Sequence, residues 1–128
     1  MTYQSYRDLD IFKKAHILAI EIHRMSLKFP KFEMFEEGSQ IRKSSKSVKN
    51  NIVEGFGRRR YKQEFIKFLT YSLASCDETR VHLDTLYETE SFKDKNEYEY
   101  FCEEYDHLDK MINNFIKSVE SKHNTTRI

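Results

Sequence analysis

Apolar residues recur along the chain with the alternating three- and four-residue spacing that predicts amphipathic helices. The first such segment is expected at about 8–29. The pattern Ser5-Tyr-Arg-Asp8 is typical of a capping box before it, and Pro30 predicts its end. Its apolar seam consists of Ile11, Ala15, Leu18, Ile22, Met25 and Phe29.

Three further segments show the same period. The second, at about 35–54, carries Ile41, Val48 and Ile52. The third, at about 61–90, carries Phe65, Leu69, Ser72, Cys76, Thr79, Leu83 and Leu86. The fourth, at about 94–121, follows a second capping-box pattern, Ser91-Phe-Lys-Asp94, and carries Tyr98, Phe101, Tyr105, Leu108, Ile112, Phe115 and Val119. The residues from about Ser121 onward are polar, which is typical of a frayed tail.

These four segments predict an all-α fold. Short connections join them, so an antiparallel up-and-down four-helix bundle buries their stripes most simply. The length of 128 residues predicts a single domain, 1–128, and the low content of Gly (3) and Pro (1) favours helices. We find no strand pattern and no internal repeat.

The second segment also carries a polar line beside its apolar one. This line consists of Gln40, Ser44, Ser47, Asn51 and Glu54. Two interpretations stay open: a buried or solvated structural face, or a contact surface for a ligand or a second subunit, where polar groups must be paired. We assign Gln40, Asn51 and Glu54 to a structural or intersubunit network. The small residues Ser44, Ser45 and Ser47 predict a close approach of another helix.

The stretch NNIVEGFGRRRY, residues 50–61, is the least ordinary part of the chain. Gly55 suits the left-handed position that ends a helix, and Gly57 lets the chain turn again. A lone GxG is a weak phosphate signal without a preceding strand. Arg59, Arg60 and Lys62 crowd the start of the third segment, where positive charge is unfavourable. We therefore expect an acidic surface or nucleic-acid phosphates to offset them.

Charge is segregated along the chain, although the formal net charge is only +1. Residues 38–62 hold eight positive side chains and one negative, a balance of +7, whereas residues 82–110 hold ten negative and three positive, a balance of −7. Such charges are often no more than solvated helix faces. They also favour head-to-tail contacts between subunits, or attraction of a phosphate backbone. The candidate nucleic-acid contacts are Arg42, Lys46, Lys49, Arg58, Arg59, Arg60 and Lys62.

Enzyme chemistry finds little support in the sequence. A carboxylate-bridged metal bundle needs two Glu-x-x-His motifs, and only Glu104-Tyr-Asp-His107 has that spacing, so no metal and no cofactor are expected. Cys76 lies on an apolar seam as a small packing residue, and Cys102 is far from it. No apolar run approaches the roughly 20 residues of a membrane span. We expect a non-enzymatic cytoplasmic protein with free thiols.

A set of short motifs carries a resemblance to a known family. The motifs are Asp8-Leu9, Phe29-Pro30 with Glu33 and Phe35, Gln40-Ile-Arg42, Ser47-Val, Asn51-Ile, Glu54-Gly55-Phe-Gly57-Arg58, Glu64-Phe65, Phe68-Leu69, Ser75 and Glu78. Over about Asp8 to Glu90 the chain resembles the proteins encoded by intervening sequences of bacterial 23S ribosomal RNA genes. The accessory variability determinant of diversity-generating retroelements is similar. The chain departs from the family at Lys49, where proline is usual, and at Arg60, where a capping Ser or Thr is usual.

The resemblance implies a four-helix bundle, commonly assembled as a ring-like homopentamer. It also implies association with ribosomal or other structured RNA, or with a nucleic-acid-processing protein, and it brings no catalytic residues. Our leading hypothesis is a non-enzymatic homo-oligomer that binds structured RNA through the corner between the second and third helices. The alternative is a protein-interaction scaffold in which basic and acidic segments pair between subunits.

Overall fold

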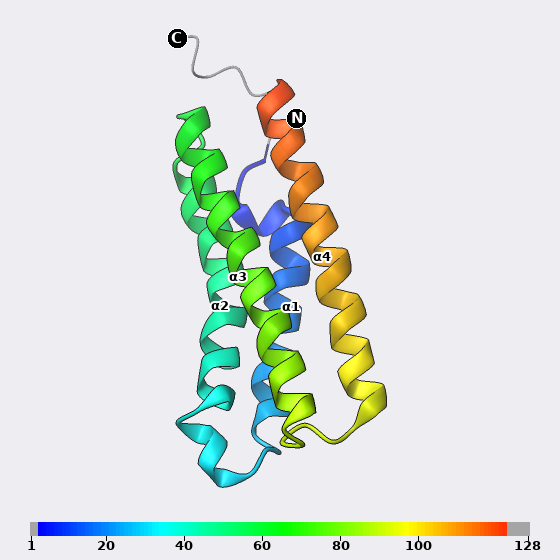
Figure 1. Ribbon diagram of the computed structural model, residues 1–128. Helices are drawn as coiled ribbons and strands as arrows, with labels where there is room; N and C mark the ends of the chain where they lie inside the picture. Colours follow the sequence, from blue (N-terminus) through cyan, green and yellow to red (C-terminus); the bar gives the residue numbers. More distant parts are fainter. Residues whose placement is uncertain (1–2, 123–128) are drawn as a thin grey trace.

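The computed structural model describes residues 3–122. Its long helices are α1 (Asp10–Ser26), α2 (Glu37–Gly57), α3 (Lys62–Glu88) and α4 (Lys95–Lys122). Figure 1 shows that helices adjacent in sequence run side by side in opposite directions. Backbone contacts join α1 to α2, α2 to α3, α3 to α4 and α1 to α4, and within residues 3–122 none join the diagonal pairs. The predicted all-α, up-and-down four-helix bundle is confirmed, and the described part of the chain contains no strand.

The predicted apolar seams form the core. Ile22, Ile41, Leu83, Leu108 and Ile112 are fully buried. The core extends past the long helices to Leu9 before α1 and Phe92 before α4. Burial of these seams away from water is the main stabilising contribution to such a bundle.

The capping box at Ser5 is present, but it does not cap α1. The Ser5 hydroxyl oxygen accepts a hydrogen bond from the Arg7 N–H at 3.1 Å, and the Asp8 carboxylate accepts one from the Ser5 N–H at 3.1 Å. These bonds close the short 3₁₀ helix η1 (Tyr6–Asp8), and α1 then begins after Leu9 without a side-chain cap. The expected start at residue 8 is therefore slightly early. α1 also ends sooner than expected, at Ser26, before a second 3₁₀ helix, η2 (Lys31–Met34).

The expected capping box at Ser91 is wrong. Asp94 caps α4, since its carboxylate accepts the Glu97 N–H at 3.1 Å. The Ser91 hydroxyl instead donates to the Glu33 carboxylate at 2.6 Å, and the other oxygen of Glu33 accepts the Gly38 N–H at 3.1 Å. Glu33 is buried, so this carboxylate ties η2 to the link between α3 and α4. Ser121 and Lys122 still lie in α4, and the rest of the expected frayed tail lies outside the described residues, from 123 onward.

Small polar residues line the α2–α3 interface. The Ser72 hydroxyl donates to the Val48 carbonyl at 2.6 Å, and Thr79 Oγ1 lies 2.9 Å from Ser44 Oγ. These bonds cross between two helices that approach closely because neither carries a bulky side chain there. The close approach expected from the serines of α2 is confirmed.

No helix in the described residues is both long and apolar enough to cross a membrane.

Candidate nucleic-acid interface

The turn between α2 and α3 differs from expectation in the role of its glycines. No described glycine has a positive φ, and α2 continues through both Gly55 and Gly57. The turn begins at Arg58 (φ −106°, ψ 13°) and is held by hydrogen bonds from the Arg58 N–H to the Gly55 carbonyl and from the Tyr61 N–H to the Arg58 carbonyl. The expectation that Gly55 ends the helix in the left-handed region is wrong.

Gly55 has a packing role instead. A Cβ atom placed there would lie 3.2 Å from the Phe68 Cβ and 3.3 Å from the Phe65 carbonyl oxygen. Gly55 is buried and allows α3 to approach the end of α2. A Cβ on Gly57 would meet nothing within 4 Å, so neither steric crowding nor a special φ requires glycine at that position.

The three arginines of the turn are exposed, and each lies over an aromatic ring. The guanidinium carbon lies 4.7 Å from the ring centroid of Phe68 for Arg58, 3.9 Å from Phe56 for Arg59 and 5.8 Å from Tyr61 for Arg60. Arg59 also donates to the Phe56 carbonyl at 3.0 Å. Cation–π contacts of this kind hold guanidinium groups in place while leaving them accessible to solvent.

The positive charge at the start of α3 is offset only in part. Arg58 pairs with Glu54 at 3.1 Å and with Glu64 at 3.2 Å. Arg60 makes no ion pair with the described residues. Tyr61, at the cap position of α3, makes no side-chain cap hydrogen bond, so the first amides of α3 lack the partner that a Ser or Thr would provide. Uncapped amides beside arginines form an environment that favours anions.

The other three candidate cations lie away from this turn. Arg42 lies on α2, fifteen positions before the last helical residue, Gly57, which is about 22 Å along the axis. Its guanidinium donates to the Ser26 hydroxyl at 3.1 Å and the Met34 carbonyl at 2.8 Å, so it ties α2 to the end of α1 and to η2. Lys46 and Lys49 instead face a groove beside α1.

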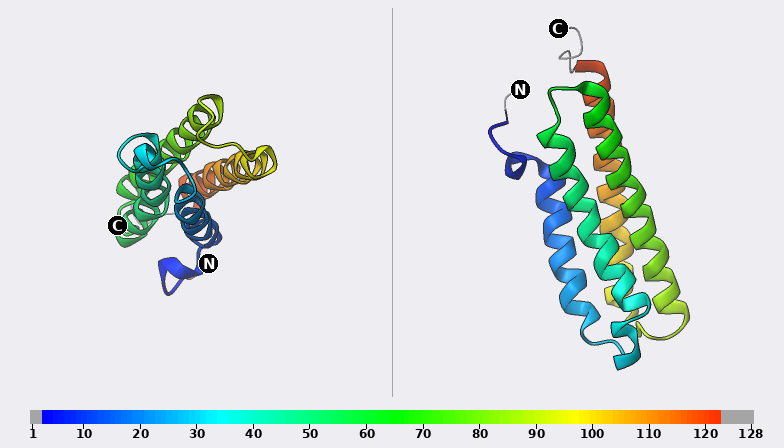
Figure 2. Two further views of the ribbon diagram at one scale, coloured as in Figure 1. Left: turned by 90° about the horizontal axis from the view of Figure 1, so that it is seen from below. Right: turned by 90° about the vertical axis from the view of Figure 1, so that its left-hand side faces the viewer.

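This α1–α2 groove comprises two adjoining hollows of about 740 and 280 Å³ that share His16 and Lys49. The right-hand view of Figure 2 shows α1 and α2 side by side, with η1 at one end. Burial, followed by the charges of Lys46, Arg42 and Arg24, lowers the pKa of His23 below its usual 6.5. The cations that line the groove are Arg7, Lys13, Arg24, Lys46 and Lys49, and among the described residues the only carboxylate in its lining is that of Glu54.

The contribution of α1 to this groove was missed from the sequence. Lys13, Ile17, Ile20 and Arg24 recur at spacings of four, three and four, which places them on one face of α1 beside its apolar seam. That mixed stripe was the available signal. Its meaning depends on the position of α2, which local spacing does not give.

The expected polar network forms only partly. The Asn51 amide donates to the Ser47 carbonyl at 2.9 Å and to its hydroxyl at 3.0 Å, and Ser47 Oγ lies 2.9 Å from Ser75 Oγ on α3. Gln40 and Glu54 are exposed, and Glu54 pairs with Arg58. An intersubunit role for Gln40, Asn51 and Glu54 stays a prediction.

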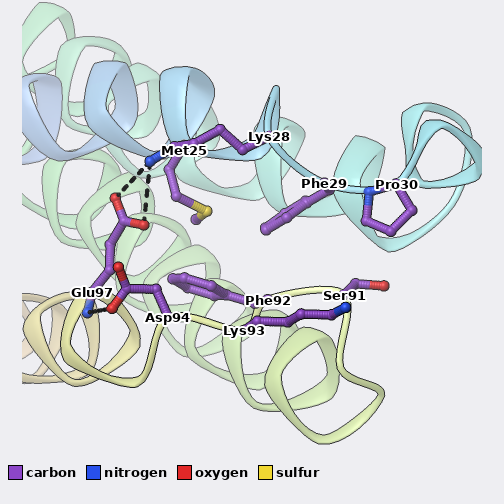
Figure 3. A pocket seen from close by; sticks show the side chains of 9 residues that line it. All are labelled: Met25, Lys28, Phe29, Pro30, Ser91, Phe92, Lys93, Asp94 and Glu97. Atoms are coloured by element: carbon purple, nitrogen blue, oxygen red, sulfur yellow. Dashed lines mark hydrogen bonds and ion pairs between the residues drawn. The ribbon is translucent and has the colours of Figure 1, made fainter.

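A further hollow of about 450 Å³ lies at the opposite end of the bundle from the arginines, between the end of α1 and the start of α4. Figure 3 shows Phe29 and Phe92 beside it, with Lys28 bonded to Glu97 at its edge. Two lysines and two carboxylates line it, so it has no preference for an anion.

The described cysteines and carboxylates offer no reactive cluster. Burial raises the pKa of the Cys76 thiol to about 12, so it is protonated and unreactive at neutral pH. Glu104 pairs with Lys14 at 2.9 Å, while His107 is exposed. Within the described residues no group of three or more His, Cys, Asp or Glu side chains is arranged to hold a metal ion.

Comparison with known proteins places the chain. The model of the family described as 23S rRNA-intervening sequence protein matches residues 7–114. The chain belongs to this family. The match extends from η1 into α4, further than the motifs alone indicated.

A solved structure supports the same assignment. It is a crystal structure of a protein with unknown function from the S23 ribosomal protein family of Bacteroides thetaiotaomicron VPI-5482, which is 25% identical to this chain with a TM-score of 0.73. The likeness covers 84% of this chain and 95% of the other. A search of curated proteins finds no match.

Proposed function

We propose that this member of the 23S rRNA-intervening sequence protein family is a non-enzymatic homo-oligomer that binds structured RNA through its arginine corner. The arginine corner comprises Arg58, Arg59, Arg60 and Lys62. The observation that carries the proposal is the set of three exposed guanidinium groups, each held over a ring, at the uncapped start of α3.

The chemistry of the corner suits a phosphate backbone. Arginine donates two parallel hydrogen bonds to phosphate oxygens, and such charge-assisted bonds are stronger than neutral ones. Ring contacts reduce the conformational freedom that each arginine loses on binding. Tyr61 is 59% exposed beside Arg60, which leaves its ring available to stack on an unpaired base of a hairpin loop.

Reversal of charge at the corner tests the proposal. The Arg59→Glu/Arg60→Glu variant should bind a fluorescent ribosomal RNA hairpin at least tenfold more weakly than the wild type in fluorescence anisotropy. The wild-type affinity should fall steeply as salt rises, because bound phosphates release counterions. Arg58 is left unchanged because its loss would also remove its ion pairs with Glu54 and Glu64.

Lys93→Glu/Lys117→Glu provides a matched control, since both lysines are exposed and the change in net charge is the same. Circular dichroism establishes that each variant keeps its helicity. Equal hairpin affinity of the corner variant and the wild type would refute the role of the corner.

Self-association is the second part of the proposal. The ring-like homopentamer implied by the family is the expected assembly, and native mass spectrometry measures its mass directly. Segregated charge supports contacts between unlike faces of neighbouring subunits. A monomer at micromolar concentration would contradict self-association, and it would leave the proposal of RNA binding unaffected.

The exposed acids give the scaffold alternative its own support. Glu88, Glu90, Glu99 and Glu103 are exposed and make no ion pair with the described residues. In a scaffold they would pair with the basic segment of a neighbouring subunit. The scaffold alternative predicts an oligomer that dissociates as salt rises. It also predicts a hairpin affinity too weak to measure at low salt.

A further inference from the structure

The α1–α2 groove is a surface distinct in shape from the arginine corner. The corner belongs to the turn between α2 and α3, which lies at one end of the bundle (Figure 2). The residues that line the groove come from η1, α1 and α2, along the side of the bundle. From Phe12 to Arg24 it follows twelve positions of α1, about 18 Å along the axis. It is long enough to hold a short extended segment.

We propose that the α1–α2 groove binds single-stranded RNA, with phosphates on Arg24, Lys46 and Lys49 and bases against the apolar side chains of α1. This inference rests on the proposed function in that it takes RNA to be the ligand class of the protein. It adds a second site with a different preference, for unpaired strands instead of helical RNA.

Charge is the first argument for the groove as an RNA site. Five cations and one carboxylate line it, and Glu54 already pairs with Arg58 of the corner. Lys13 pairs with Asp10 at 4.0 Å, which leaves four cations without an ion pair among the described residues. Repulsion among these four disfavours such a cluster unless an anion joins it. A phosphate backbone supplies anions at regular intervals along an extended path.

The position of Lys46 gives the second argument. Its ammonium group lies 3.1 Å from the Nδ1 of His23. Burial, followed by the neighbouring cations, lowers the pKa of His23 below 6.5, so the neutral ring accepts this bond at neutral pH. The bond fixes one lysine at the groove wall with two of its donors still available.

Apolar and aromatic groups in the groove distinguish RNA from a simple inorganic anion. The rings of Phe12 and His16 are stacked, with centroids 5.5 Å apart and planes at 12°. Ile17 is 56% exposed and Ile20 is 37% exposed beside them. Unpaired bases present flat faces to such surfaces, and stacking on them tolerates any sequence. Paired bases in a duplex do not expose those faces.

Anisotropy titration of a fluorescent ten-nucleotide single-stranded RNA tests the inference. The wild type should bind it, and Lys46→Glu/Lys49→Glu should weaken that binding at least tenfold and reduce the slope of log affinity against log salt by about 1.4. The control Lys93→Glu/Lys117→Glu should stay within about threefold of the wild type. Ile17→Ala, which changes an exposed side chain and no charge, should weaken binding about threefold or more.

An abasic oligomer of the same length separates base contacts from backbone charge. It should bind at least fivefold more weakly than the normal strand, because it keeps the backbone charges and lacks the bases that stack on the groove. Equal binding of the two oligomers would overturn the base-binding role of the groove. Equal binding of a decaglutamate peptide and the RNA strand would overturn it too, because the groove would then fit any polyanion, including an acidic protein segment.

The corner and groove hypotheses fail in different ways. Arg59→Glu/Arg60→Glu should lose the hairpin and keep the single strand, and Lys46→Glu/Lys49→Glu should lose the single strand. If the wild type binds the single strand but not the hairpin, the role of the corner is overturned and that of the groove is not. Failure to bind the single strand at low salt overturns the groove.

Discussion

Replacing Gly55 with alanine tests the close approach of α3 to the end of α2. An added Cβ would lie 3.2 Å from the Phe68 Cβ, 3.3 Å from the Phe65 carbonyl oxygen and 3.4 Å from the Phe65 ring. All three atoms belong to α3, and one of them is backbone. The helices must therefore separate by a few tenths of an ångström, because a rotation of one side chain does not relieve all three contacts.

Two opposing free-energy terms decide the result. Alanine is favoured over glycine inside a helix by about 1 kcal/mol. Overpacking a tight contact costs about 1–3 kcal/mol. The net expectation for Gly55→Ala is a destabilisation of about 1 kcal/mol in the free energy of unfolding.

Gly57→Ala is the matched control. It is the same chemical change two residues later in the same helix, and the new Cβ meets nothing within 4 Å. Without a steric penalty, Gly57→Ala should be neutral or stabilising by a few tenths of a kcal/mol or more. The gain is smaller than in a helix interior because Gly57 is at the helix end. The two variants should therefore differ by about 1–2 kcal/mol.

Urea denaturation followed by circular dichroism measures this difference through the shift in midpoint at constant slope. Thermal unfolding should show Gly55→Ala melting roughly 3–6 °C below the wild type. If Gly55→Ala is as stable as Gly57→Ala, the close approach does not constrain the sequence and the packing argument is refuted.

Three further predictions concern single groups in the bundle. Glu90 lies two residues after the end of α3 and has a positive φ of 68°. Glu90→Gly should therefore raise the free energy of unfolding by about 1 kcal/mol, measured by urea denaturation. A loss of stability would contradict this. The Tyr105 hydroxyl is buried and has no hydrogen-bond partner among the described residues, so Tyr105→Phe should be neutral or stabilising by up to about 1 kcal/mol; a clear loss of melting temperature would reveal a partner. Burial, followed by the neighbouring Asp77 carboxylate, raises the pKa of Asp109 from 3.8 to about 6. The contribution of Asp109 to the free energy of unfolding is therefore fully present below about pH 4. It is lost as pH rises to 6, and the loss is at most about 3 kcal/mol. Asp109→Asn should lack this part of the pH dependence in urea midpoints, and parallel profiles for the two proteins would refute it.

At the arginine corner, the sequence predicted the position of the arginines but not their partners. Its exposure and its place at the α2–α3 turn follow from the polar run after the seam of α2, and both were expected. The partners were not: the ring contacts of Arg58 and Arg59 with Phe68 and Phe56 depend on how the turn folds back on itself. Arg42, grouped with them by sequence, is instead held by Ser26 and Met34.

Of the two predicted capping boxes, the one at Ser5 forms and the one at Ser91 does not, because only Ser91 has a partner from a distant part of the chain. Ser5 and Asp8 close a local turn within three residues, so the bonds form as expected, although on η1. Ser91 had a non-local competitor, the buried carboxylate of Glu33, which lies 58 positions earlier in the chain and comes close only when the bundle is folded. A carboxylate removed from water needs donors, and Ser91 is one of them.

The sequence by itself determined the four helices, their buried faces and their order around the bundle, because these depend on periodicity and on short connections. Tertiary structure decided what the surface groups do. It made Gly55 a contact point instead of a helix end, and it joined the mixed stripe of α1 to Lys46 and Lys49 of α2 in one groove. The physical reason is that the rotation and offset of packed helices place side chains within a few ångströms of one another, and spacing within one helix does not specify either quantity.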